Sequence, residues 1–190
     1  MAAYQFGLNV IPRKGVLEKF GYVPERLEVD FEERKNYYHL KKDGLLKKEG
    51  EFKDALTQDW WSSTELQPIE IIRQIDKIVA RRDEHNNCVF WKTYLFSKLD
   101  NDAFMSINAE TGKIEELLFR ADLGEENLKF LKDMVGLAKE YDWLLMDLNG
   151  NLANPEIQGV FRLAKISNAF KFVQNPLGFL ADLNNEDIQI

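Results

Sequence analysis

The stretch from residue 113 to residue 151 constrains the fold more than any other part of the chain. Residues 114–121 have strand composition, a helical pattern opens at Gly124 and runs to about Tyr141, and residues 142–147 form a second short apolar run. A strand, a crossover helix and a returning strand can bury one another's apolar sides, so we expect a strand–helix–strand crossover unit here. This unit predicts a fold and no particular reaction.

The flanking segments predict more strands and helices. Residues 3–11 alternate as a half-buried strand does, and residues 65–81 place Ile69, Ile72 and Ile75 at helical spacing. Further predictions are a loop at 83–87, strands at 88–96, 103–108 and 114–122 in a meander, a type I′ turn at Asn149-Gly150, a helix from residue 154, and a short terminal helix at 177–183. Residues 31–59 give no usable pattern.

Together these elements predict a single α+β domain spanning residues 1–190. The sheet is expected to be mixed and mainly antiparallel, with four to six strands, and the crossover helix and the 65–81 helix are expected to cover one face. The C-terminal helices would close one end. A hydrophobic content of 45% is sufficient for a sizeable core.

The net charge of −7 is unevenly distributed along the chain. Residues 101–150 carry 11 acidic and 5 basic side chains, so most of the excess negative charge lies in and around the predicted crossover unit. This disfavours nucleic-acid binding through phosphate neutralisation and favours attraction of a basic partner. The alternative is that these carboxylates only form a solvated surface.

Cellular location follows from three features of the sequence. No apolar run approaches the roughly 18 residues that a transmembrane helix needs. The first residues lack a basic flank followed by an apolar segment, and the single cysteine, Cys88, has no partner for an internal disulfide. We therefore expect a cytoplasmic protein without a membrane segment.

The residue types that usually carry chemistry are scarce. His39, His85 and Cys88 are too few ligands for a structural zinc site, and the calcium-like run from Asp147 to Asn151 has Leu152 where a glycine is required. Nucleophile and phosphate-binding motifs are absent. We therefore predict no catalytic, cofactor-binding or metal-binding residues. Carboxylate chemistry stays open, because any two of the 32 acids can be neighbours in space.

Two features are candidate partner-binding surfaces. Trp60 and Trp61 are adjacent, so both rings cannot face one core in a helix or strand, and at least one is expected to be partly exposed. The alternative is that one ring packs in the core and the other covers its rim. The second candidate is a continuous acidic face formed by Glu110, Glu115, Glu116, Asp122, Glu125 and Glu126.

Residues 119–155 resemble a pattern found in immunity proteins of bacterial toxin–antitoxin competition systems. The pattern consists of the strand end Phe119-Arg120-Ala121-Asp122, a helix, an apolar strand, and then Asp147-Leu148-Asn149-Gly150-Asn151-Leu152-Ala153-Asn154-Pro155. The same layout occurs in many small bacterial proteins of unknown function, and it covers about a fifth of this chain. The resemblance implies a non-catalytic inhibitor with an acidic docking face and no cofactor, and it assigns no individual residue.

These observations favour a non-enzymatic, cytoplasmic protein-binding module, most concretely an immunity-type inhibitor of a basic protein partner. A small carboxylate-dependent hydrolase or ligand-binding protein is the first alternative. A homodimeric scaffold of unknown role, built on Trp60 and Trp61, is the second.

Overall fold

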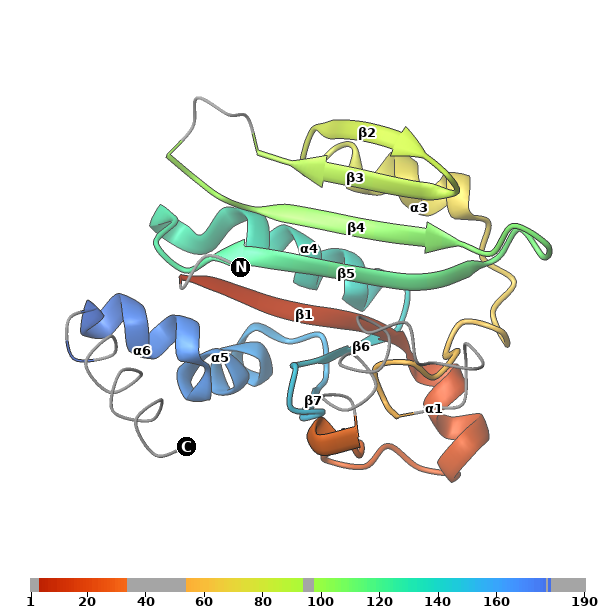
Figure 1. Cartoon of the computed structure of the whole chain (residues 1–190), viewed down its shortest axis with the longest axis horizontal. Coiled ribbons are helices and arrows are strands. Elements are labelled where there is room, and N and C mark those ends of the chain that lie inside the picture. Colours follow the sequence, from red (N-terminus) through yellow and green to blue (C-terminus); the bar gives the residue numbers. More distant parts are fainter. Residues whose placement is uncertain (1–3, 34–53, 94–97, 177, 179–190) are drawn as a thin grey trace.

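The computed structural model describes residues 4–33, 54–93, 98–176 and 178. Within them the chain forms one seven-stranded sheet with the order β2-β3-β4-β5-β1-β6-β7 (Figure 1), in which every strand pair is antiparallel. The strands are β1 Gln5–Pro12, β2 Arg81–His85, β3 Cys88–Lys92, β4 Asp102–Ile107, β5 Ile114–Asp122, β6 Trp143–Met146 and β7 Leu152–Ala153. The α+β class is confirmed, and the predicted meander is part of this sheet.

The predicted mixed sheet is wrong, because every strand pair is antiparallel, and the predicted strand–helix–strand unit does not place β5 and β6 side by side. Strands β5 and β6 are joined by helix α4 (Lys129–Glu140), but β1 lies between them and pairs with both in antiparallel register. The patterns of β5, α4 and β6 predict these elements, although α4 begins at Lys129 rather than at Gly124, because Asn127 and Leu128 have positive φ. These local patterns give no information about β1, which lies more than 100 residues earlier in the chain and is inserted between β5 and β6.

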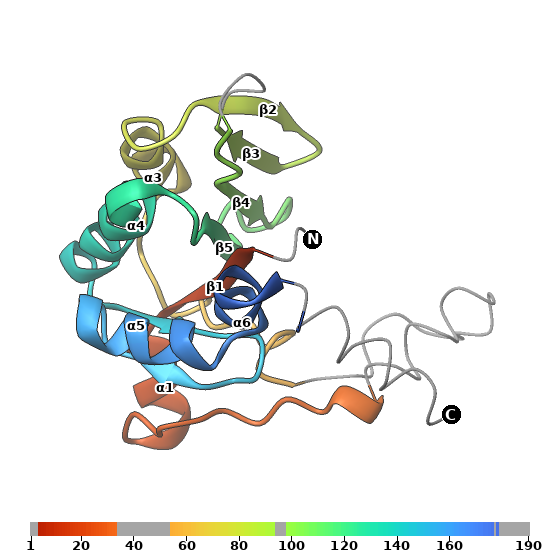
Figure 2. The ribbon, with the colours of Figure 1, turned by 90° about the vertical axis from the view of Figure 1, so that its left-hand side faces the viewer.

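Five α-helices and one short 3₁₀ turn surround the sheet in the described residues. They are α1 Arg13–Phe20, α3 Pro68–Ile75, the turn η1 Glu126–Leu128, α4 Lys129–Glu140, α5 Ile157–Ile166 and α6 Asn168–Gln174. Figure 2 shows α3 and α4 on the same side of the sheet, as the sequence predicts. Helix α5 contacts β7, and α6 contacts β1. None of these helices is long and apolar enough to cross a membrane.

A large part of the core fills the layer between the sheet and the helices α3 and α4. The stripe of α4 that the sequence predicts is buried, including Leu131, Met134 and Val135. Phe130 meets Phe119 of β5 edge to face, with ring centroids 5.9 Å apart. Met105, Leu117 and Phe119 share the buried face of β4 and β5, because Met105 pairs with Leu117 and the neighbouring Ala103 pairs with Phe119.

The segment that was predicted as a helix at 65–81 and a loop at 83–87 differs from the prediction. The helix is limited to α3, and Arg81 instead begins the edge strand β2, whose five residues are all exposed. Because both faces of β2 are open to solvent, its sequence lacks the apolar alternation that identifies a strand. The hairpin turn to β3 is made by Asn86 and Asn87, both with positive φ.

The β6–β7 turn also departs from the type I′ geometry. Gly150 has a φ of 85°, but Asn149 does not have a positive φ. The Asp147 carboxylate accepts the backbone N–H of Asn149 and of Asn151, both at 2.9 Å, and thereby fixes the turn. Apart from Gly178, the predicted terminal helix at 177–183 lies outside the described residues, as does most of the unassigned segment 31–59.

Candidate functional site

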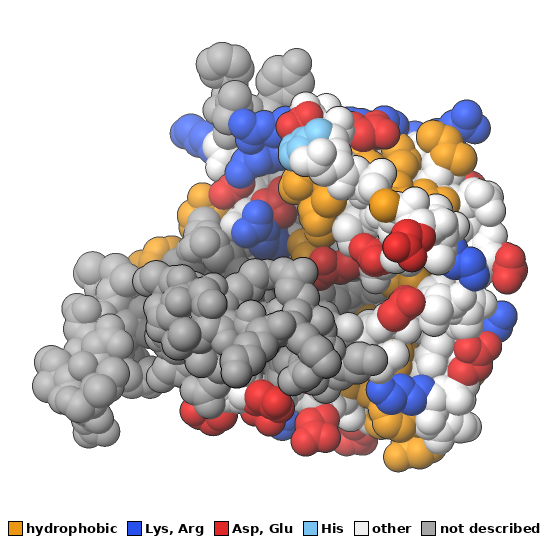
Figure 3. Space-filling view, turned by 45° about the vertical axis from the view of Figure 1, so that its right-hand side comes forward, with side chains coloured by type: hydrophobic (Ala, Val, Ile, Leu, Met, Phe, Trp, Pro, Cys, Tyr) orange, Lys and Arg blue, Asp and Glu red, His pale blue; other side chains and the backbone are white. Residues whose placement is uncertain are grey.

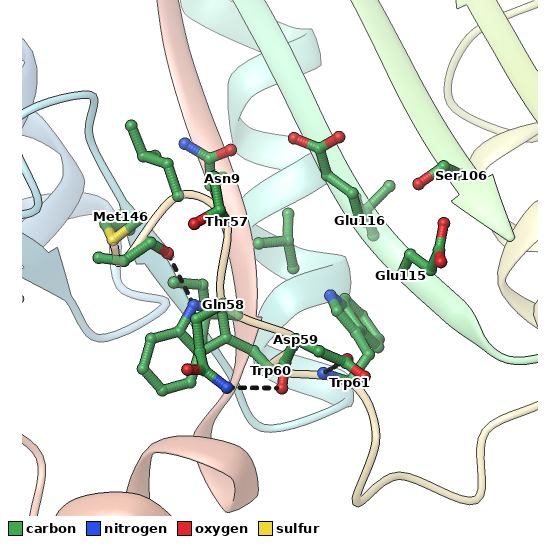
Figure 4. A pocket seen from close by; sticks show the side chains of 15 residues that line it. Asn9, Thr57, Gln58, Asp59, Trp60, Trp61, Ser106, Glu115, Glu116 and Met146 are labelled. Carbon is green, nitrogen blue, oxygen red and sulfur yellow. Dashed lines mark hydrogen bonds between the residues drawn. The ribbon is translucent and has the colours of Figure 1, made fainter. Parts of the chain in front are cut away.

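A cleft of about 300 Å³ opens between residues 55–61 and strands β1, β4, β5 and β6 (Figure 4). Its volume is at the low end of the range of about 300–1,000 Å³ that ligand pockets occupy. The lining residues shown with labels are Asn9, Thr57, Gln58, Asp59, Trp60, Trp61, Ser106, Glu115, Glu116 and Met146. The cleft therefore brings together four of the eight predicted partner-binding residues.

Trp60 and Trp61 hold one wall of this cleft in place. Trp60 is 6% exposed and Trp61 is 1% exposed, so the prediction that at least one ring is partly exposed is wrong. Trp61 packs edge to face on Trp143 at 5.3 Å between ring centroids, whereas the indole N–H of Trp60 donates to the carbonyl of Ala55 at 2.8 Å. The two rings can both be buried because residues 54–61 form turns, in which neighbouring side chains are not forced to opposite faces.

Asp59 shapes the turn that carries the two tryptophans. Its Oδ1 accepts the backbone N–H of Trp61 at 3.1 Å and that of Ser62 at 3.0 Å. The side chain of Lys113, in the β4–β5 turn, donates to the Ser62 carbonyl at 2.8 Å and joins this segment to the hairpin. Sequence reasoning missed Asp59 as a site residue, although aspartate is a common turn-forming residue and stands directly before the tryptophans.

A β-bulge explains how two consecutive glutamates reach the same cleft. Ser106 pairs with Glu116 and Ile107 pairs with Ile114, so Glu115 is the extra residue on β5. In a regular strand Glu115 and Glu116 would point to opposite faces. Figure 4 shows both side chains at the cleft, with Glu115 exposed and Glu116 half-buried. The Glu115 carboxylate also accepts the Asn108 side-chain amide at 2.8 Å.

The other acidic residues of the predicted face do not line the cleft with Glu115 and Glu116. Glu110 lies in the β4–β5 turn, whereas Asp122, Glu125 and Glu126 lie at the opposite end of β5, a strand of nine residues that spans roughly 30 Å. Figure 3 shows acidic side chains interspersed with basic and apolar ones over the face it presents. The expected continuous acidic face therefore does not form.

Two of these distant acids have structural partners. Asp122 is 5% exposed, and its carboxylate accepts the backbone N–H of Asp100 and of Gly124. Glu125 accepts the backbone N–H of Phe130 at 3.1 Å and the side-chain amide of Asn101 at 3.3 Å. Their carboxylates thus hold the connection from β5 to α4, a role that acidic density in the sequence does not distinguish from partner binding.

The charged residues in the described lining of the cleft are all acidic. Asp59, Glu115 and Glu116 are its charged lining residues, and no Lys or Arg lines it among the described residues. A concave surface of one charge sign concentrates the field and raises the local concentration of oppositely charged groups. The geometry therefore suits a cationic group, either an ammonium or a guanidinium, that accepts no hydrogen bond and donates several.

The metal-binding candidates of the sequence are separate from this cleft. His85 and Cys88 face each other across the β2–β3 turn, and His85 Nδ1 lies 3.1 Å from Asp83. In the calcium-like run, Asp147 already accepts hydrogen bonds from three N–H groups, including the side-chain amide of Asn151. No group of three or more His, Cys, Asp or Glu side chains is placed to hold a metal ion within the described part of the chain.

Comparison with known proteins finds no matching family model, no matching curated protein and no matching solved structure.

Proposed function

We propose that the protein is a non-enzymatic binding module for a basic protein partner, and that the partner inserts a lysine or arginine side chain into the cleft. The observation that carries this proposal is the lining itself, with three carboxylates and no described cationic residue. Glu115 and Asp59 are exposed lining residues, so an approaching cation can reach their carboxylates from solvent. Long-range attraction then speeds association.

The most specific form of this proposal is an immunity-type inhibitor acting in the cytoplasm. The layout of residues 119–155 supports the class, and the single cysteine supports the compartment. The docking residues of this proposal are Glu115, Glu116 and Asp59. Asp122 and Glu125 are left out of it because they lie at the opposite end of β5, outside the cleft lining.

Affinity capture from a lysate of the source cells tests this proposal when charge-reversed variants are run in parallel. The test variant is Glu115→Lys combined with Glu116→Lys. The control combines Glu126→Lys with Glu110→Lys, which changes the net charge equally at exposed positions outside the cleft lining. We expect the wild type and the control to retain a basic protein that the test variant loses.

The captured protein then allows association kinetics to be measured. We expect the association rate to fall steeply with added salt and to fall by at least roughly tenfold in the test variant at low salt. Unfolding curves of the variants confirm that the fold is unchanged. Equal capture by both variants, or a captured partner that is acidic, would contradict the proposal.

A further inference from the structure

A second cavity, of about 730 Å³, is lined by arginines. It lies between α5, residues 23–26 and the strands β6 and β7, and it shares no lining residue with the acidic cleft. Among the described residues, three guanidinium groups, from Arg13, Arg26 and Arg162, line it together with one carboxylate, that of Glu25. In a chain with a net charge of −7, three arginines around one cavity are a marked local reversal of charge.

The fold holds these arginines by different contacts. Arg13 Nε is 2.7 Å from Asp142, and its Nη2 donates to the Asn154 side chain at 2.9 Å, so its charge is already paired. Arg26 forms a β-bridge with Asn151 and uses Nε to donate to the Asn149 carbonyl at 2.9 Å. This contact leaves the two Nη groups of Arg26, the outer fork of its guanidinium, without a hydrogen bond to any described residue.

Arg162 folds back over the first turn of its own helix. Its Nη2 lies 3.8 Å from where a Cβ of Gly159 would stand, and Gly159 is buried beside the Asn154 carbonyl. The guanidinium of Arg162 therefore lies beside residue 159 at this wall of the cavity. Arg162 makes no hydrogen bond or ion pair within the described part of the chain, so its donors remain available to a ligand.

The rest of the lining is largely apolar. Leu144 and Leu163 are buried, Val23 and Leu152 are half-buried, and Ile166 is exposed at the edge. A hydrated inorganic ion would gain no binding free energy from these apolar surfaces. An organic group attached to an oxyanion would gain it, because contact with them buries its own apolar surface. Planar guanidinium forks recognise phosphate and carboxylate oxygens by paired hydrogen bonds.

We propose that this cavity binds a small organic anion, whose phosphate or carboxylate group contacts Arg26 and Arg162 and whose apolar part lies on the accessible side chains of Val23, Leu152 and Ile166. This inference is independent of the proposed protein partner, because it uses other residues and another charge sign.

Titration followed by NMR tests the inference on the full-length wild-type chain. The probes are phenyl phosphate, benzoate, inorganic phosphate and the neutral benzyl alcohol. We expect phenyl phosphate or benzoate to bind with a Kd below roughly 1 mM and to shift the amide signals of Gly159 and Asn151. The tighter of the two identifies the oxyanion. Inorganic phosphate is expected to bind at least roughly tenfold more weakly, because it lacks the apolar part.

Two variants and one matched control complete the experiment. Arg26→Gln and Arg162→Gln are each expected to weaken binding by roughly tenfold or more, since each removes charged hydrogen-bond donors. Lys165→Gln removes an exposed charge from the same helix outside the cavity and should leave the Kd unchanged. Absence of binding by both organic anions, equal binding of benzyl alcohol, or unchanged affinity in both arginine variants would overturn the inference.

Discussion

Arg120 on β5 grips Asp102 on β4 through two parallel hydrogen bonds, from Nε to Oδ1 at 2.8 Å and from Nη2 to Oδ2 at 2.7 Å. The side chain of Asp102 is 9% exposed and that of Arg120 is 34% exposed. Gln5 of β1 also donates to Asp102, at 3.2 Å. One carboxylate therefore ties three neighbouring strands together on the sheet face opposite the buried Met105 and Phe119.

Replacement of Arg120 by methionine tests the strength of this link. The variant leaves a largely buried carboxylate with only the Gln5 amide as a side-chain partner, so we expect the free energy of unfolding to fall by about 2 kcal/mol. The loss is smaller than for a fully buried pair because Arg120 is partly solvated. Urea denaturation measures it. The double variant Arg120→Met/Asp102→Asn should lose less unfolding free energy than the sum of the losses in the two single variants. A loss equal to that sum would contradict direct coupling between the two side chains.

Gly15 in α1 is a position where alanine is expected to destabilise a helix. A Cβ at this residue would overlap the carbonyl oxygen of Trp60, which belongs to the wall of the acidic cleft. We expect Gly15→Ala to lower the free energy of unfolding by about 1–3 kcal/mol through overpacking. The matched control is Gly136→Ala in α4, where a Cβ meets nothing within 4 Å. That change should stabilise the protein by about 0.5–1 kcal/mol, because alanine is the better helix former.

The turn between β6 and β7 requires glycine at position 150 for two reasons. Its φ is 85°, which favours glycine, and a Cβ at this position would overlap the carbonyl oxygen of Leu27. We expect Gly150→Ala to cost roughly 3 kcal/mol in unfolding free energy. Gly112→Ala separates the two causes, because Gly112 has a φ of 67° and open space around it, and it should cost only about 1 kcal/mol. Similar losses in thermal or urea unfolding would show that the contact with Leu27 is unimportant.

Asp76 gives the stability of the protein a dependence on acidic pH. Hydrogen bonding from Arg81 lowers the pKa of Asp76 from its ordinary value of 3.8, and the Trp91 indole N–H donates to the same carboxylate at 2.8 Å. A pKa that is lower in the folded state means that the charged form stabilises the fold above the unfolded-state pKa. This contribution is lost as the pH falls through the folded-state pKa.

The variant Asp76→Asn measures that contribution. At pH 7 we expect it to be less stable than the wild type, and the difference in unfolding free energy should shrink as the pH falls below about 4. Because the Asp76 side chain is 32% exposed, solvent screening keeps the difference small. Glu126→Gln, at an exposed position, is the control. A difference that stays constant from pH 7 to pH 3 would contradict the linkage.

Elements with a strong local pattern were predictable from the sequence. Strand β5 has the predicted bounds, β6 and the buried stripe of α4 agree with the prediction, and β1 differs from it only at its ends. Each of these elements buries one face or both, so its apolar residues repeat with the period of its own backbone. Strand β2, with both faces exposed, carries no such period and was predicted as a loop.

For the candidate sites, the sequence by itself determined which residue types are available: paired glutamates, paired tryptophans and scattered arginines. Only the tertiary structure decided that Trp60 and Trp61 are both buried and that a bulge directs the side chains of Glu115 and Glu116 toward the same cleft. It alone also decided that three arginines from different segments line a second cavity. The physical reason is that each of these features depends on contacts between distant segments, as does the insertion of β1 between β5 and β6. Strand pairing, bulges and cavity walls are set by contacts between residues far apart in the chain, and local periodicity carries no record of those contacts.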